Sequence, residues 1–227
     1  LLSGIAVSIE KRPLALVIAY DPLRERFKER PYKVVETTLT AIPGLRLCRA
    51  FLTNAQMARL LAAVDREAWR SDLSRRVQHY GYRYDYKKRT VDREDYLGPL
   101  PDWMAPLAQR IADEGFMAAV PDQVIVNEYF PGQGIAPHID CEPCFGPTIV
   151  SVSLGSDCVM DFTHVTSNQT HSLLLAEGSL LALEGAARYF WKHGIAKRKS
   201  DVVDGEKQFR ERRVSLTFRN VVIDPDR

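Results

Sequence analysis

The second half of the chain is a series of short hydrophobic runs, and this series limits the possible folds more than any other feature. Each run is rich in Val, Ile, Leu, Thr, Phe or Tyr and is bounded by residues that favour turns, such as Gly, Asp, Asn and Pro. Short strands at this spacing predict an antiparallel sandwich or barrel. The runs are Val124–Phe130, Thr148–Leu154, Cys158–Val165, Ser172–Leu175, Ser179–Leu183, Arg188–Ile195 and Arg213–Val222.

Two helices are predicted before these strands. The first follows the possible N-cap oxygens of Thr53 and Asn54, and the second begins near Pro101 and Asp102. Apolar residues recur at helical spacing in both. They are Met57, Leu60, Leu61 and Val64 in the first, and Trp103, Leu107 and Ile111 in the second. The sequence therefore predicts an α+β fold with a jelly-roll-like β core, one sheet face of which is covered by N-terminal helices.

The chain has 227 residues, enough for one large domain with a sizeable core. We expect residues 41–227 to form that domain and residues 1–40 to be an extension of unknown role, with possible strands at Ile5–Ile9 and Leu14–Tyr20. The longest apolar run, Leu14–Tyr20, is far shorter than the roughly 20 residues of a membrane helix. No convincing signal-peptide cleavage site is present, so the expected location is the cytoplasm, or the nucleus if the source is eukaryotic.

Composition and missing motifs exclude several classes of protein. Hydrophobic residues make up 45% and charged residues 26% of the chain, which excludes disordered, collagen-like and coiled-coil proteins. The net charge of +2 neither requires nor excludes a polyanionic partner. The absence of Gly-x-Gly-x-x-Gly, Gly-x-x-x-x-Gly-Lys-Ser/Thr and Gly-x-Ser-x-Gly disfavours dinucleotide, P-loop and serine-hydrolase chemistry.

The pair His138 and Asp140 is the first candidate metal site. In a strand, residues two apart point to one face, so the imidazole and the carboxylate could ligate one ion. His193 would complete a two-His, one-carboxylate triad of the kind that binds Fe(II). His164 and His171 are alternatives, but they lie near a polar loop where a solvated role is favoured. Taken alone, the pair is better explained as a turn Asp beside a half-buried His.

Four motifs in a fixed order give a more specific signal. They are Asn127-x-Tyr129-x-Pro131-Gly132, His138-x-Asp140, the distal His193, and Arg213 followed six residues later by Arg219. Together they resemble the AlkB family of Fe(II)- and 2-oxoglutarate-dependent dioxygenases, over about residues 44–222. Within that family the chain looks closest to bacterial AlkB-like proteins and to the animal homologue that modifies a tRNA wobble uridine.

The resemblance implies a double-stranded β-helix (jelly-roll) core and a role for each matching residue. The implied Fe(II) ligands are His138, Asp140 and His193, and the implied 2-oxoglutarate site is Arg213 and Arg219, assisted by Asn127 and Tyr129. The implied reaction consumes O2, converts 2-oxoglutarate to succinate and CO2, and hydroxylates a C–H bond of the substrate. A methyl group hydroxylated on nitrogen then leaves as formaldehyde.

The spacing of the two arginines agrees with this site independently. An even separation in a strand puts Arg213 and Arg219 on one face, with Ser215 and Thr217 between them. Their Cα atoms would lie roughly 20 Å apart, too far to hold one carboxylate but suitable for opposite ends of a five-carbon diacid. We expect a bidentate contact from Arg213 to the distal carboxylate, with Arg219 at the metal end. The alternative is a pair of solvated strand arginines.

The chain has four cysteines, too few for a disulfide scaffold, and a reducing compartment is favoured. Cys141 and Cys144 form a Cys-x-x-Cys directly after the His-x-Asp pair. It could be half of a zinc site, which Cys48, Cys158, His164 or His171 would have to complete. Because no second Cys-x-x-Cys exists, a loop with two reduced thiols is favoured. Nearby iron chemistry would make these thiols prone to oxidation.

Residues 75–89 combine aromatic and basic side chains. This stretch holds four of the nine tyrosines and six basic residues against one acidic residue. Aromatic faces stack on unpaired bases, and basic groups bind phosphate. Tyr82, Tyr84 and Tyr86 would share one face of a strand. The candidate substrate-binding residues are Tyr80, Tyr82, Arg83, Tyr84 and Tyr86. The alternative is an amphipathic hairpin whose tyrosines are half in the core.

Three functional hypotheses follow. The first is a dioxygenase that demethylates alkylated bases in RNA or single-stranded DNA, so that nucleic acid is the expected partner. The second is the same chemistry on a tRNA wobble modification or on methylated protein. The third is a non-catalytic β-sandwich that binds nucleic acid, in which His138 and Asp140 are structural. Only the third predicts no iron-dependent turnover of 2-oxoglutarate.

Overall fold

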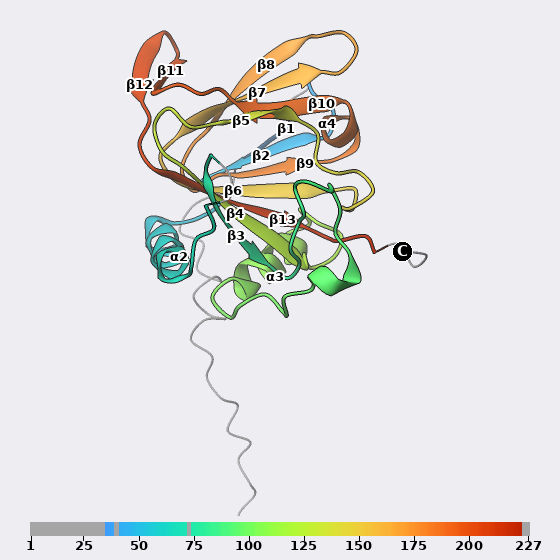
Figure 1. Ribbon diagram of the computed structural model, residues 1–227. Coiled ribbons are helices and arrows are strands. Elements are labelled where there is room, and N and C mark those ends of the chain that lie inside the picture. Colours follow the sequence, from blue (N-terminus) through green and yellow to red (C-terminus); the bar gives the residue numbers. More distant parts are fainter. Residues whose placement is uncertain (1–34, 39–40, 72–73, 224–227) are drawn as a thin grey trace, which may run out of the picture.

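The computed structural model describes residues 35–38, 41–71 and 74–223, so the possible strands Ile5–Ile9 and Leu14–Tyr20 lie outside the described residues. Two antiparallel sheets are stacked (Figure 1). The larger contains, in spatial order, β1 (Val35–Thr38), β2 (Leu45–Arg49), β9 (Leu180–Leu183), β6 (Ile149–Gly155), β13 (Arg213–Arg219), β4 (Gln123–Tyr129) and β3 (Arg76–Tyr80). The smaller contains β5 (Ile135–His138), β10 (Trp191–Ile195), β7 (Cys158–His164) and β8 (Thr170–Leu175).

Helices cover the face of the larger sheet that points away from the smaller one (Figure 1). They are α2 (Asn54–Arg66) and α3 (Ala105–Asp113). The α2 N-terminus has the predicted cap, because the Thr53 side chain accepts from the Gln56 backbone N–H while the Gln56 side chain accepts from that of Thr53. Apolar residues of both helices share one buried cluster with alternate residues of β13. The predicted α+β class and the covering helices are therefore confirmed, although α3 begins at Ala105 and not near Pro101 and Asp102.

The predicted strand positions are largely confirmed, with one correction. All seven hydrophobic runs are strands over most of their length, but the run predicted at Arg188–Ile195 starts inside a short helix, α4 (Gly185–Tyr189), and only its second part is β10. Phe190 N–H donates to the Ala186 carbonyl and closes this helical turn. The two alanines after Gly185 favour a helix over a strand, which explains the difference.

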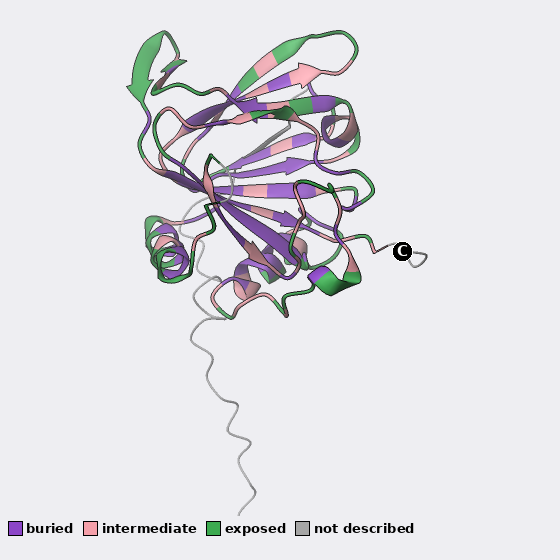
Figure 2. Ribbon diagram, in the orientation of Figure 1, coloured by how far each residue is buried: buried purple, intermediate pink, exposed green. Residues whose placement is uncertain are grey.

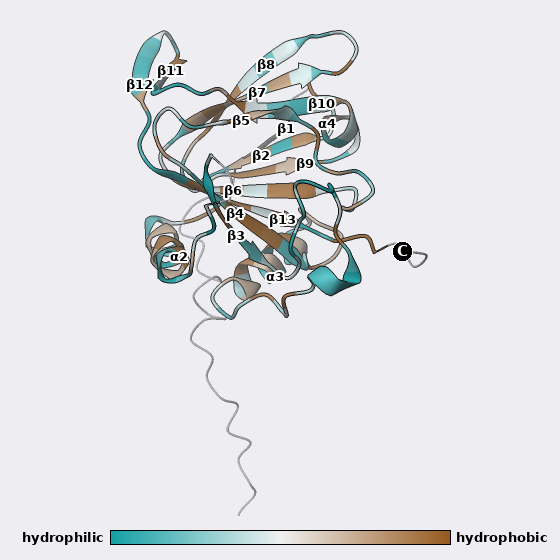
Figure 3. Ribbon diagram, in the orientation of Figure 1, coloured by the Kyte–Doolittle hydropathy of each residue, from teal (hydrophilic) through white to brown (hydrophobic). Residues whose placement is uncertain are grey.

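Strand β2 and one hairpin escaped prediction, and the hairpin did so because its sequence has no hydrophobic alternation. The hairpin of β11 (Ser200–Val203) and β12 (Glu206–Phe209) projects from the body, and β12 is exposed along its length (Figure 2). The same hairpin is mostly hydrophilic in Figure 3. Without hydrophobic alternation, a strand leaves little trace in a sequence.

The larger sheet extends toward the N-terminus beyond the expected domain. β1 lies within the range 1–40 that we assigned to the extension, and it pairs with β2 in a register that places Glu36 opposite Cys48. The sheet therefore begins at Val35 in the described part of the chain. Among the described residues, no helix has the length and apolar character needed to cross a bilayer.

Candidate active site

Alternation along β13 separates the core from a cavity between the two sheets. Val214, Leu216 and Phe218 pack toward the helices, whereas the residues between and beside them line the cavity. On the neighbouring β4, Asn127 pairs with Ser215 and Tyr129 with Arg213. The cavity has a volume of about 390 Å³. The strand periodicity that places both arginines on one face therefore directs them into this cavity.

Three possible metal ligands converge at the side of the cavity formed by the smaller sheet. His138 and His193 are directly paired between β5 and β10, and their ring centroids are 4.5 Å apart. Asp140 follows β5, and its Oδ1 lies 3.8 Å from His138 Nε2. The possible ligand atoms of these three residues all lie within 4.8 Å of one another. One ion could contact all three.

The alternative histidines lie elsewhere. His164 and His171 both pack against Trp191, with ring centroids 5.0 Å and 5.5 Å from its ring centroid. Among the residues that the structure describes, His138, Asp140 and His193 form the single cluster of side chains suited to a metal ion.

The protonation states of the cluster suit a metal. His138 Nδ1 lies 2.9 Å from the Ala136 carbonyl oxygen, and an N–H there leaves the Nε2 lone pair for an ion. Burial and the neighbouring His138 lower the pKa of His193 to about 4. Burial alone would raise the pKa of Asp140, but positive groups, Arg219 first among them, bring it below its usual range. His193 is therefore a neutral imidazole and Asp140 a carboxylate at neutral pH, the forms in which these groups bind a metal.

Buried atoms without partners show that the site fits a metal and an anionic ligand. Asp140 Oδ2, His193 Nδ1, Arg219 Nε, and Arg213 Nε and Nη1 are buried and have no hydrogen-bond partner among the described residues. Such atoms are costly unless something else satisfies them. A cation at the first two residues and a carboxylate at the arginines would meet this requirement.

The two arginines lie at different positions along the cavity, as their spacing predicts. Arg219 Nη2 donates to Asp140 Oδ1 at 3.1 Å, so Arg219 is at the metal end. Arg213 Nη2 donates to Ser153 Oγ at 2.9 Å, and its other nitrogens are left for a ligand. The Tyr129 ring centroid lies 5.7 Å from the Arg213 guanidinium carbon. This arrangement can hold the two ends of a diacid.

Asn127 also borders the cavity, and its orientation is set by a residue that the sequence did not single out. Arg75 Nε donates to Asn127 Oδ1 at 2.8 Å, so the Asn127 amide nitrogen remains available as a donor. The Arg75 guanidinium carbon also lies 5.9 Å from the Tyr129 ring centroid. The signal for Arg75 was its place at the start of the basic and aromatic stretch.

The five candidate substrate residues separate into two groups. Tyr84 and Tyr86 line the cavity, together with Arg89. Tyr80 instead packs edge-on against Trp103 in the helix-side core. The remaining two, Tyr82 and Arg83, contact Tyr96 and Asp95 respectively.

The prediction that Tyr82, Tyr84 and Tyr86 share a strand face is wrong. β3 ends at Tyr80, and the chain turns at Gly81, which has a φ of +74°. A Cβ on Gly81 would lie 1.7 Å from the Asp122 carbonyl oxygen, so this turn requires glycine. The turn breaks the alternation that the sequence pattern assumed.

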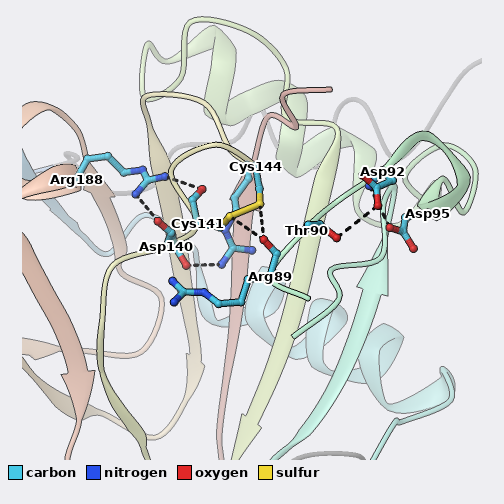
Figure 4. Close-up of a disulfide and its surroundings, with 9 residues drawn as sticks. Arg89, Thr90, Asp92, Asp95, Asp140, Cys141, Cys144 and Arg188 are labelled. Carbon is cyan, nitrogen blue, oxygen red and sulfur yellow. Dashed lines mark hydrogen bonds and ion pairs between the residues drawn. A yellow bond between two sulfur atoms is a disulfide. The ribbon is translucent and has the colours of Figure 1, made fainter. Parts of the chain in front are cut away.

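The expectation of two reduced thiols is also contradicted. Cys141 and Cys144 are joined by a disulfide next to Asp140 of the metal cluster (Figure 4). Cys48 and Cys158 are buried and lie outside this disulfide. A three-residue separation allows a disulfide to close within one turn, so a Cys-x-x-Cys can form a disulfide as well as a zinc site or a reduced loop.

Comparison with known proteins agrees with the fold and the site. The family model of the 2OG-Fe(II) oxygenase superfamily matches residues 44–219. An Arabidopsis thaliana protein named alkylated DNA repair protein ALKBH8 homolog is 38% identical over 84% of this chain and 62% of its own length. A Mus musculus protein, tRNA (carboxymethyluridine(34)-5-O)-methyltransferase ALKBH8, is 36% identical over 79% of this chain and 30% of its own length. The chain thus spans less than two thirds of either relative.

A solved structure shares the fold. The structure of OsALKBH1 superimposes with a TM-score of 0.59 at 20% identity, covering 82% of this chain and all of that one. Sheet order, metal cluster and family match together define an iron-dependent oxygenase with a double-stranded β-helix core. The chain belongs to the 2OG-Fe(II) oxygenase superfamily, as an AlkB-like dioxygenase.

The superfamily uses Fe(II), 2-oxoglutarate and O2, and the residues present fit this set. His138, Asp140 and His193 would hold the iron, which when bound supplies the oxidising chemistry. Arg219 keeps Asp140 ionised and fixes its orientation. Arg213 would orient the diacid by its distal carboxylate. Apolar residues from both sheets also line the cavity and make that part of its surface unfavourable for water, namely Ile125, Ile149, Leu181 and Ile195.

Proposed function

We propose that this dioxygenase oxidatively demethylates alkylated bases in RNA or single-stranded DNA, releasing succinate, CO2 and formaldehyde. The observation that carries the proposal is that one cavity is lined by two different sets of residues. The inner wall consists of Asn127, Tyr129, Arg213 and Arg219 on strands. The outer wall consists of Arg75, Tyr84, Tyr86 and Arg89.

The outer wall has the chemistry of a base-binding site. The Tyr84 and Tyr86 rings meet edge-on with centroids 5.0 Å apart, and Arg75 lies 6.0 Å from the Tyr86 centroid. Aromatic faces stack on unpaired bases, and guanidinium groups bind phosphate or stack on a base. A base that is flipped out or already unpaired could therefore enter between this wall and the metal cluster.

The inner wall supports the reaction by holding the co-substrate. We assign the distal carboxylate of 2-oxoglutarate to Arg213 and the metal end to Arg219, with Asn127 and Tyr129 assisting. A cavity of about 390 Å³ is within the usual range for small-molecule sites and accommodates a small diacid beside a base. The two walls would thus bind co-substrate and substrate in the same enclosed space.

A second candidate is the same chemistry on a tRNA wobble modification. It is favoured by the similarity to the mouse protein, whose name refers to uridine 34 of tRNA. The match covers 30% of the mouse protein, so the activity in its name belongs to a protein most of which lies outside the matched region. Methylated protein is a further alternative for the same site.

The test compares three substrates in parallel: an N-methylated single-stranded oligonucleotide, tRNA, and a methylated histone peptide. We expect formaldehyde in proportion to succinate with the oligonucleotide. Turnover should be absent in His138→Ala and retained in His164→Ala, since His164 lies outside the cluster. A tRNA product heavier by one oxygen atom, without formaldehyde, would favour the second candidate. Equal, low succinate formation with all three would contradict the demethylase proposal.

A further inference from the structure

The disulfide next to the iron-ligand cluster touches the outer wall through one backbone atom. Cys141 directly follows Asp140, and the sulfur atoms of Cys141 and Cys144 each lie 3.3 Å from the carbonyl oxygen of Arg89 (Figure 4). The Arg89 side chain lines the large cavity. The sulfur pair is therefore in direct contact with a residue of the proposed substrate site.

The contact that holds Arg89 depends on the oxidation state of the pair. A thiol S–H is a donor, although a weak one, and a disulfide has no hydrogen to donate. Among the described residues, no backbone N–H donates to the Arg89 carbonyl. Two thiols would thus give this oxygen two donors, and the disulfide leaves it in van der Waals contact with sulfur only.

The Arg89 backbone is strained in the disulfide form described here. Arg89 is exposed and has a φ of +56°, a left-handed conformation that is unfavourable for a residue with a side chain. Its own N–H donates to the Asp85 carbonyl at 2.7 Å. A small cavity of about 30 Å³, lined by Arg89, Pro143 and Cys144, leaves room beside the contact.

The iron side of the pair is fixed by contacts that do not change on reduction. Buried Arg188 donates from Nη1 to the Asp140 carbonyl at 2.9 Å and from Nη2 to the Cys141 carbonyl at 3.3 Å. Val222 N–H donates to the Cys144 carbonyl at 2.9 Å. A change at the sulfur atoms is therefore directed toward Arg89 and away from the iron ligands.

We propose that Cys141 and Cys144 form a redox-active pair that sets how firmly Arg89, a residue of the proposed substrate site, is held at the cavity. The dithiol donates to the Arg89 carbonyl and restrains this segment, whereas the disulfide form described here keeps Arg89 at the cavity without that restraint. In the forward step a dithiol reductant breaks the S–S bond, gives each sulfur one hydrogen and leaves as its own disulfide. Oxidised glutathione reverses the step and leaves as two molecules of reduced glutathione. Glu142 and Pro143, between the cysteines, are exposed, so the loop is at the surface.

The first measurement does not need a substrate. The chain is equilibrated with reduced dithiothreitol or with oxidised glutathione, and alkylation followed by mass spectrometry determines the oxidation state. Hydrogen exchange is then followed over residues 85–96. We expect faster exchange there in the disulfide form and equal exchange in β4 and β13. Equal exchange over residues 85–96 in the two forms would overturn the proposal.

The second measurement rests on the proposed function, and it uses the methylated oligonucleotide as probe. The KM for the oligonucleotide should be about three- to tenfold higher in the disulfide form, the size expected for one or two weak hydrogen bonds. The KM for 2-oxoglutarate should stay the same. If no nucleic acid is demethylated while exchange still responds, the proposed function fails and the redox pair stands.

Two double variants separate loss of the donors from loss of the bond. Cys141→Ser with Cys144→Ser keeps two hydroxyl donors and cannot form a disulfide, so it should match the reduced form under both conditions. Cys141→Ala with Cys144→Ala removes the donors and should match the disulfide form. If the serine and alanine variants exchange equally over residues 85–96, donation to Arg89 is not the mechanism and the proposal is wrong.

Discussion

The inner and outer walls of the cavity are built in different ways. The inner-wall residues Asn127, Tyr129, Arg213 and Arg219 lie on β4 and β13 and are each at most 7% exposed. Outer-wall residues Tyr84 and Tyr86 are only half-buried, Arg89 is exposed, and all three lie in an irregular segment after β3. Paired central strands hold side chains more rigidly than loops do. The co-substrate, which is the same in every reaction cycle, would thus be bound by the rigid wall and the substrate by the adaptable one.

Loss of a metal ligand should have the largest effect, because the co-substrate and the substrate both depend on the same ion. His193→Ala should abolish iron binding and lower succinate formation by more than about 100-fold, beyond the loss typical for residues that only support a ligand. Iron content and succinate formation are the measurements. His164→Ala is the matched control, since His164 contacts Trp191 outside the cluster. Iron binding that survives in His193→Ala would contradict the assignment of the site.

Substitution of an inner-wall residue alone should weaken the binding of 2-oxoglutarate and leave iron binding unchanged. In Arg213→Met, the KM for 2-oxoglutarate should rise about 10- to 100-fold, because charged hydrogen bonds of roughly 1.5–3 kcal/mol are lost. Arg213→Lys keeps the positive charge but loses the bidentate guanidinium geometry. Its KM for 2-oxoglutarate should therefore lie between those of wild type and Arg213→Met. Steady-state kinetics at saturating Fe(II) measures both. An unchanged KM in Arg213→Met would place the distal carboxylate elsewhere.

Substitution of an outer-wall residue should instead weaken substrate binding and leave the binding of 2-oxoglutarate unchanged. Tyr86→Ala should raise the KM for a methylated oligonucleotide about tenfold, within the range for loss of one stacking partner. Its KM for 2-oxoglutarate should change less than about twofold. The control is Tyr96→Ala, because Tyr96 is exposed and outside the cavity lining. A rise in the KM for 2-oxoglutarate alone would show that the two walls do not divide the ligands in this way.

The smallest predicted effect concerns the ion-pair network around Glu128, which lies on the same strand as the inner-wall residues Asn127 and Tyr129. Glu128 on β4 accepts from Arg76 at 2.9 Å and from Arg212 at 2.7 Å. Burial alone would raise the pKa of Glu128, but these two guanidinium groups hold it below its ordinary value. The stabilisation is thus present at neutral pH and is lost as the pH falls from about 5 through the lowered pKa.

Urea unfolding at several pH values tests the contribution of this ion-pair network. The free energy of unfolding should fall between about pH 5 and pH 3, and Glu128→Gln should flatten that slope. Glu206→Gln, on the exposed β12, is the control. An identical slope in wild type and Glu128→Gln would show that this ion-pair network does not contribute to the pH dependence.

The contrast between the walls also explains what could be predicted from the sequence. Period-two alternation on β13 directs Arg213 and Arg219 to one face, and the pairing of β5 with β10 joins His138 to His193, so motif and strand pattern lead to the same cluster. The roles of these residues remain predictions until tested. The alternation is valid only while the chain stays in a strand, and the turn at Gly81 ends it.

Beyond that turn, contacts distant in sequence decide which side chains reach the cavity. Tyr84 packs against Phe145 with ring centroids 5.6 Å apart, 61 positions along the chain. The backbone of the loop that carries Arg89 meets Cys141 and Cys144. No local sequence pattern encodes such contacts. The sequence therefore predicts an aromatic and basic substrate site but not which of its residues line the cavity.

The central claim is that His138, Asp140 and His193 hold iron while the inner wall holds 2-oxoglutarate next to it. Anaerobic addition of Fe(II) and 2-oxoglutarate, followed by visible absorption, tests it most directly. We predict a weak charge-transfer band that is lost in His138→Ala, requires more 2-oxoglutarate in Arg213→Met, and is kept in Tyr86→Ala. A wild-type protein without the band, or a band that persists in His138→Ala, would contradict the claim.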